Sequence, residues 1–171
     1  LKRRGIPVEL HVFGDTKDKL EVTFEHVSYP TLGGSEVAEL LNKMDLMICP
    51  EEDAGWSNPA AEAMACGVPL VCTEAGTLDF AIHEETALVV PNRHADAIAD
   101  AAERVYRDRE LAEKLSRAGL VKIREYTWIN VARNLLDVFA GARLDRESRE
   151  RKNRVALERY YEKPSRAANP D

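Results

Sequence analysis

Metal and redox sites find little support in the composition of this chain. Its 171 residues include only three cysteines, Cys49, Cys66 and Cys72, with no Cys-x-x-Cys pair and no Cys/His metal spacing. Because the number is odd and the surroundings are apolar, we expect buried free thiols, as in a protein of the reducing cytoplasm. The sequence therefore predicts a cytoplasmic protein with no metal site, and we expect no cofactor.

Long apolar runs and excess positive charge are also lacking. No run reaches the roughly 18 apolar residues that a membrane-spanning helix needs. The formal net charge is −6, so no bulk cationic field favours nucleic acid as a partner. No signal peptide is recognisable. Since Leu1–Arg4 before Gly5 has the pattern of the last turn of a helix, that absence carries little weight.

The chain does contain a regular alternation of short apolar runs with helical segments. Buried parallel strands read as such runs, separated by the helices that cover them. We therefore predict an α/β fold with a Rossmann-like parallel sheet and helices on both faces. Ser35 is expected to cap the helix after the second strand. The expected strands are Val8–Phe13, Leu20–Val27, Leu46–Cys49, Leu70–Thr73 and Ala87–Val90.

After Pro91 the pattern is helical only. Apolar residues recur at helical spacing in three segments, and Thr127 is placed to cap the third. We predict a domain over residues 1–142, followed by a charged helix and tail over residues 143–171. A solvated helix explains this charge best, and peripheral contact with the inner face of a membrane or with another domain is the alternative.

The most informative stretch runs from Gly55 to Pro69, after a predicted buried strand. Asn58 fits a helix N-cap, Pro59 fits the first helical position, and Gly67 ends the helix. Gly55 permits a positive φ or the close approach of a ligand. Backbone N–H groups of residues 54–58 and the positive helix end would converge on an anion such as a nucleotide diphosphate. The alternative is a well-capped helix that binds nothing.

Glu62 lies one turn into this helix. The helix dipole stabilises a carboxylate there by about 0.3–1 kcal/mol, which alone could explain the residue. Its neighbours are small or apolar, so we expect the helix to be largely buried and the carboxylate to need a partner. Paired ribose hydroxyls would suit it, because a carboxylate accepts two O–H hydrogen bonds at once.

Gly55–Trp56, Pro59 and Glu62–Pro69 resemble the signature Glu-Gly-Phe-Gly-Leu-Pro-x-x-Glu-Ala-Met-Ala-x-Gly-x-Pro-Val-Val. This pattern is typical of the C-terminal, donor-binding domain of family 4 (group 1) retaining glycosyltransferases, which have the GT-B fold. The similarity extends from about Val8 to Phe139 and includes further matching positions, namely Asp45, Ala75–Gly76, Ala87–Pro91 and Tyr126–Trp128.

The resemblance implies a nucleotide-sugar donor (UDP-, GDP- or dTDP-sugar) with its ribose on Glu62. The amides of Trp56, Ser57 and Asn58 would face the sugar and its phosphates, beside Gly55. Other positions lie further from this motif: Val27 and Ser28, after the second strand, would lie near the base, and Gly14 would form the floor of the cleft. The acceptor, a glycan, a lipid or a small molecule, would be bound by an N-terminal domain that precedes Leu1.

The sequence departs from the family pattern in three ways that bear on activity. Ala54 stands where the family has a second glutamate beside the transferred sugar, and Glu52 or Asp53 could take its place. Ser57 replaces a glycine and Asn58 a leucine. The family's phosphate-neutralising Arg and Lys would precede Leu1. We therefore expect the chain alone to be inactive, and we assign no catalytic base.

Two alternatives fit the same residues. Ala54 favours a non-catalytic nucleotide-sugar-binding or scaffold module of the same fold. A GT-B sugar-nucleotide epimerase would share the donor site and differ in its product.

Overall fold

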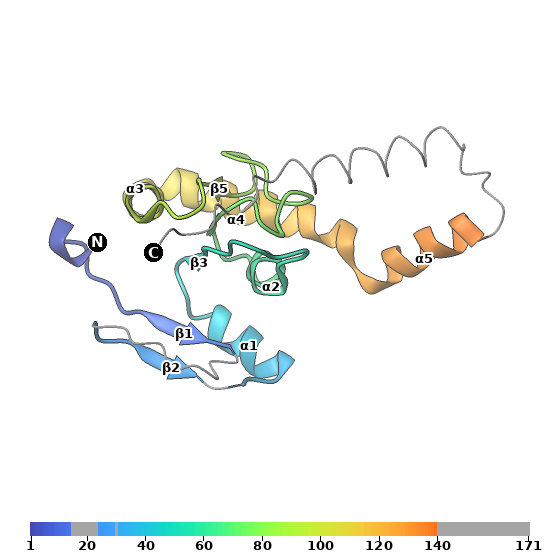
Figure 1. Cartoon of the computed structure of the whole chain (residues 1–171), viewed down its shortest axis with the longest axis horizontal. Helices are drawn as coiled ribbons and strands as arrows, with labels where there is room; N and C mark the ends of the chain where they lie inside the picture. The colour runs from blue at the N-terminus through green and yellow to red at the C-terminus, as the bar shows by residue number, and fades with distance from the viewer. Residues whose placement is uncertain (15–23, 30, 140–171) are drawn as a thin grey trace, which may run out of the picture. The chain divides into compact units, whose positions relative to one another are not determined.

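A computed structural model describes residues 1–14, 24–29 and 31–139 of the chain (Figure 1). The chain divides into two compact units, Leu1–Glu125 and Tyr126–Asp171. The predicted boundary at residue 142 and the charged extension after it lie outside the described residues, so that division stays a prediction.

The first unit alternates short strands with helices, which confirms the predicted α/β class. The 3-10 turn η1 (Lys2–Arg4) lies near its start, and Gly5 closes this turn with φ 74°. A second 3-10 turn, η2 (Arg124–Tyr126), includes the last two residues of this unit and the first of the next. The strands and helices of this unit are β1 (His11–Phe13), β2 (Val27–Tyr29), α1 (Gly34–Leu41), β3 (Met47–Cys49), α2 (Asn58–Ala65), β4 (Leu70–Cys72), β5 (Leu88–Val89), α3 (Ala95–Arg107) and α4 (Arg109–Ile123).

All strand pairs in the described residues are parallel, as predicted, and they form two sheets. The first sheet pairs β1 with β2, in a register that sets His11 opposite Val27. The second has the order β3-β4-β5, with Cys49 opposite Cys72. Parallel strands place their carboxyl ends at one edge, so the connections after β3, β4 and β5 meet there.

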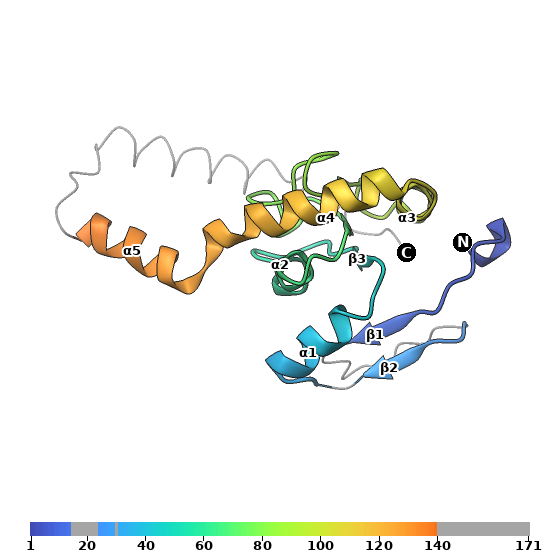
Figure 2. The same cartoon turned by 180° about the vertical axis from the view of Figure 1, so that it is seen from behind.

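The β3–β5 sheet is covered on both faces, as expected for short apolar strands (Figures 1 and 2). On one face, Val71 and Leu88 pack with residues of α3 and α4 such as Val105 and Leu115. On the other face, Leu41 of α1 and Ala63 of α2 form a second cluster, which Phe13 of β1 and Met47 of β3 also contact. This second cluster joins the two sheets and seats α2 against the first unit's core.

Two predicted boundaries in this unit are wrong. Of the predicted strand Leu20–Val27, residues 20–23 lie outside the described residues and residues 24–26 are not in a strand. Strand β2 begins at Val27, where the pairing with β1 starts: the Val27 N–H donates to the Leu10 carbonyl at 2.8 Å. Helix α1 is capped at Gly33 and already contains Ser35. The Glu36 carboxylate accepts the Gly33 N–H at 2.7 Å, which starts the helix before the serine.

In the second unit the described helix is α5 (Trp128–Phe139). Thr127 caps it as predicted, because its Oγ1 accepts the Asn130 N–H at 3.3 Å. No helix within the described ranges has both the length and the apolar character needed to cross a membrane.

Candidate functional site

Helix α2 begins at the carboxyl edge of the β3–β5 sheet, and its cap differs from the predicted one. Ser57 is the N-cap: its Oγ accepts the Ala60 N–H at 3.3 Å, and the residue is fully buried. Asn58 and Pro59 are the first two helical residues, so the prediction of Asn58 as the cap was wrong. The Asn58 N–H is one of the first-turn donors that have no acceptor within their own helix, and the residue is exposed.

The expected convergence of three amides on one anion is contradicted at Ser57. The Ser57 N–H donates to the Gly76 carbonyl at 2.9 Å, so this amide already has a protein acceptor. Trp56 is 38% exposed and packs its ring edge-on against the buried Phe80, with ring centroids 4.8 Å apart. The loop before α2 is therefore seated on the connection after β4, and Asn58 offers the clearest N–H for a ligand.

Glu62 is exposed, which contradicts the expected burial of its helix on that side. The buried side of α2 consists of Ala60, Ala63 and Met64, and Glu62 lies off this stripe. Within the described residues its carboxylate has no hydrogen bond or ion pair. Its negative charge adds to the burial that raises the pKa of Cys66. The carboxylate is thus accessible to a ligand. Because it is not buried, it does not need a protein partner to offset a cost of desolvation.

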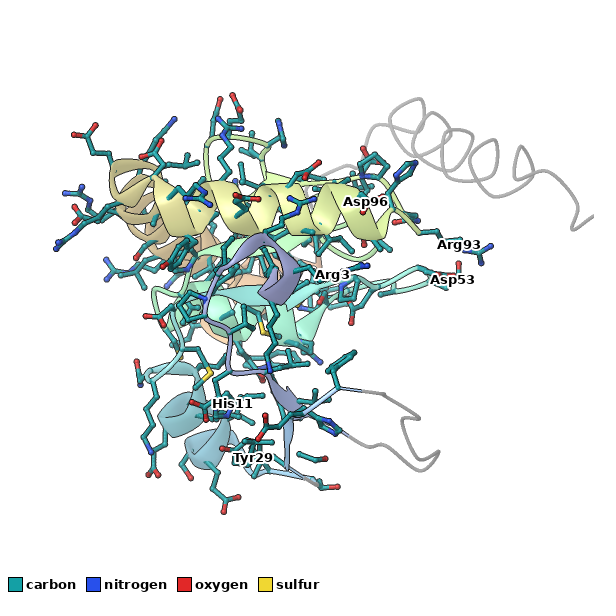
Figure 3. All side chains as sticks on the ribbon, turned by 90° about the vertical axis from the view of Figure 1, so that its left-hand side faces the viewer. Arg3, His11, Tyr29, Asp53, Arg93 and Asp96 are labelled. Atoms are coloured by element: carbon teal, nitrogen blue, oxygen red, sulfur yellow. The ribbon has the colours of Figure 1, made fainter. Side chains whose placement is uncertain are left out.

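Two of the three carboxylates in the acidic loop after β3, those of Glu52 and Asp53, are exposed. Glu52 is exposed, and one of its oxygens accepts hydrogen bonds from Nε of Arg93 at 2.9 Å and from Nη2 at 2.7 Å. These bonds, with the charges of Glu52 and Asp53, raise the pKa of Arg93. Figure 3 shows Asp53 and Arg93 together at the tips of their loops. The structure directs Glu52 to Arg93, and a sugar-facing role for Glu52 or Asp53 stays a prediction.

Glu51, the third carboxylate of this loop, has buried surroundings that the sequence did not predict. Its Oε2 is buried and has no hydrogen-bond partner in the described part of the chain, while its backbone carbonyl accepts the Thr73 hydroxyl. Burial first, and the nearby Glu51 charge, raise the pKa of the Cys49 thiol to about 12. The pKa of Cys72 is raised to about 11, mainly by burial. All three cysteines are free thiols, as predicted, although Cys66 is only partly buried.

The remaining predicted positions lie on the other sheet. Gly14 follows β1 with φ 128°, and no atom of the described residues, apart from its chain neighbours, lies within 4 Å of where a Cβ would project. Val27 and Ser28 are exposed and stand inside β2, opposite His11 and Val12, so the prediction that they follow a strand was wrong. A role for these three residues near the base stays a prediction.

A second polar group missed from the sequence lies on the β1–β2 sheet. The Tyr29 hydroxyl lies 3.1 Å from Nδ1 of His11, and Nε2 of His11 lies 3.1 Å from a Glu9 oxygen. The two rings are stacked, with centroids 5.8 Å apart. Figure 3 labels both residues. Among the described residues, no three His, Cys, Asp or Glu side chains gather as a metal site would require.

Comparison with known proteins identifies a family that this chain matches. The family model described as "Glycosyl transferases group 1" matches residues 1–108. A D-inositol 3-phosphate glycosyltransferase of Saccharomonospora viridis is 30% identical over 114 residues, which cover 66% of this chain and 26% of that protein. The chain spans about a quarter of the length of such curated relatives.

Solved structures agree on the fold. The C-terminal domain of a group 1 glycosyl transferase from Francisella tularensis has 22% identity and a TM-score of 0.56, over 60% of this chain and 54% of that one. Anabaena Alr3699/HepE, solved in complex with UDP-glucose, has 13% identity and a TM-score of 0.63, over 71% of this chain and 34% of that one.

Proposed function

This chain belongs to the group 1 glycosyltransferases, and from that premise we propose that it is the donor-binding half of a retaining enzyme that moves a sugar from a nucleotide sugar to an acceptor. The donor nucleotide lies at the start of α2, with its diphosphate at the Asn58 N–H and its ribose on Glu62. UDP is the first nucleotide to test, because a structural neighbour was solved in complex with UDP-glucose.

One observation carries this proposal: α2 presents an accessible carboxylate one turn after an N-terminal N–H that has no acceptor among the described residues. Asn58 and Glu62 are both exposed, and both follow a buried cap at Ser57. An N–H at a positive helix end suits a phosphate, and a carboxylate suits vicinal hydroxyls. The spacing of the two groups on one short helix therefore matches a nucleoside diphosphate.

The chemistry assigned to this site is stabilisation of the leaving group. When the bond between the anomeric carbon and the diphosphate oxygen breaks, negative charge grows on that oxygen. An N–H donor and a helix dipole fixed at this point stabilise that charge without reorganising during the reaction. The sugar then passes to an acceptor glycan, lipid or small molecule with its configuration retained.

Nucleotide binding is tested by thermal unfolding with UDP, GDP and dTDP. A ligand at 100 times its Kd adds ~2.7 kcal/mol to the free energy of unfolding, so a binding nucleotide raises the Tm visibly. Glu62→Gln should reduce that rise, while Glu39→Gln, an exposed glutamate on α1, should leave it unchanged. Equal losses in the two variants, or no rise with any nucleotide, would refute the proposal.

Ala54 favours a second candidate, a non-catalytic nucleotide-sugar-binding module of the same fold. The two candidates differ in turnover by the full-length protein. Sugar transfer that Ala54→Glu alters supports the enzyme, whereas donor binding without any transfer supports the module. Product analysis in the same assay identifies a sugar-nucleotide epimerase, which would return a nucleotide sugar in place of a glycosylated acceptor.

A further inference from the structure

We propose that Gly76, in the connection after β4, is a positioning residue for the donor site. It holds the loop before α2 in the position from which the Asn58 N–H and Glu62 can reach the nucleotide. This inference rests on the proposed function and adds a residue that lies outside the donor-contacting motif.

The first evidence is how closely the loop packs on Gly76. A Cβ on this glycine would lie 2.8 Å from Cβ of Ala54, 2.8 Å from the Ser57 nitrogen and 3.1 Å from the Trp56 carbonyl carbon. Distances under 3.0 Å are not tolerated between such atoms, and two of these three belong to the backbone, which cannot rotate away. Any side chain at position 76 must therefore push the loop outward.

The second evidence is a hydrogen bond that carries the position of Gly76 into α2. Its carbonyl accepts the Ser57 N–H at 2.9 Å. Ser57 in turn accepts the Ala60 N–H on its Oγ, which fixes the first turn of the helix. Gly76 thus fixes the position of Ser57, and Ser57 fixes the direction in which the following N–H groups point.

The support under Gly76 is itself fixed. The Thr77 hydroxyl donates to the Thr73 carbonyl at 2.5 Å, and the Phe80 N–H donates to the Thr77 carbonyl at 3.0 Å. Thr73, Thr77 and Phe80 are all at most 1% exposed. Since this support cannot yield, a side chain at position 76 displaces the loop and leaves the connection after β4 in place.

Gly67 provides a matched control for the backbone effect. Its φ is 71°, against 72° for Gly76, so a Cβ strains both positions alike. At Gly67, however, the nearest atom to a Cβ is Oγ of Ser116 at 3.5 Å, an ordinary contact. Gly67 ends α2 on the side away from the donor groups. Gly67→Ala therefore reproduces the strain without moving the loop.

The test measures UDP affinity by calorimetry for the wild-type chain, Gly76→Ala, Gly67→Ala and the double variant Gly76→Ala/Ala54→Gly. We expect Gly76→Ala to raise the Kd for UDP by about tenfold, equivalent to ~1.4 kcal/mol. Gly67→Ala should keep the wild-type Kd while losing similar thermal stability. Removing the Ala54 Cβ should recover part of the affinity, which a general loss of stability would not do.

Equal changes in Kd for the two alanine variants, or a wild-type Kd in Gly76→Ala, would overturn the inference. Failure of the wild-type chain to bind UDP would instead overturn the proposed function on which it rests. If Gly76→Ala does not fold, hydrogen exchange on the wild-type chain decides the matter. Slow exchange of the Ser57 amide supports the inference, and fast exchange contradicts it.

Discussion

Arg93 donates two hydrogen bonds, at 2.7 and 2.9 Å, to a single oxygen of Glu52 and so joins the connections after β5 and β3 across the carboxyl end of β4. The residues are 41 positions apart in the sequence. Arg93 adopts φ 59°, a left-handed conformation that residues other than glycine rarely adopt. The ion pair links the two loops, and the left-handed backbone of Arg93 carries a steric strain.

The first prediction separates these two effects at position 93. Arg93→Ala removes the ion pair and keeps the left-handed strain, whereas Arg93→Gly removes both. We expect Arg93→Gly to melt about 2 °C higher than Arg93→Ala, because glycine adopts this φ without a steric cost. Thermal unfolding followed by circular dichroism measures the difference. A lower Tm for the glycine variant would show that residue 93 is not left-handed in solution.

The second prediction concerns the cap of α2. Ser57→Ala should lower the free energy of unfolding by about 1 kcal/mol, because Oγ of Ser57 accepts the Ala60 N–H and the residue is buried. Asn58→Ala should change the free energy of unfolding by only a few tenths of a kcal/mol, since Asn58 is an exposed first-turn residue. Urea unfolding of both variants decides which residue is the cap, and the reverse order of losses would restore Asn58 to that role.

The third prediction follows from the buried thiols. The pKa of Cys49 is raised to about 12 and that of Cys72 to about 11, chiefly by burial. A thiol in the unfolded chain ionises near pH ~8.5. Below that pH the two thiols are protonated in both the folded and the unfolded chain, so the free energy of unfolding keeps its full value. As the pH rises from there toward 11–12, the unfolded state loses protons first. Stability then falls by about 1.4 kcal/mol per pH unit for each thiol.

Urea unfolding at a series of pH values from 8 to 11 checks this dependence. The double variant Cys49→Ala/Cys72→Ala should show a shallower fall than the wild type, since the other titrating groups are common to both. Parallel curves would mean that the two thiols are not buried in the folded state.

The fourth prediction addresses the buried oxygen of Glu51. A buried carboxylate oxygen without a hydrogen-bond partner costs free energy, so Glu51→Met should stabilise the ligand-free chain by about 1 kcal/mol. Glu52→Met is the control, because Glu52 is exposed and paired with Arg93. We expect this control to bring no gain. Destabilisation by Glu51→Met would reveal a partner for the carboxylate.

The sequence predicted the α/β class and the strands β1, β3, β4 and β5 well, because these depend on local apolar patterns. It also predicted the glycine at the end of α2, where φ is positive. It failed where a distant residue decides between two local options. Ser57 and Asn58 are both good caps, and the Gly76 carbonyl is what binds the Ser57 N–H. The start of β2 depends likewise on pairing with β1.

The exposure of Glu62 was missed for another reason. Alanines surround it on both sides of α2, so the composition of the helix does not show which side faces the core. The partner of Glu52 was missed because nothing near Arg93 in the sequence identifies an acid 41 residues away.

The most direct test of the account is a titration of the isotope-labelled chain with UDP, followed by amide NMR shifts. The account predicts that the largest changes occur between Gly55 and Glu62, with Asn58 among them, and that they weaken in Glu62→Gln. Changes confined to other segments, with the Asn58 and Glu62 signals unmoved at saturating UDP, would contradict it.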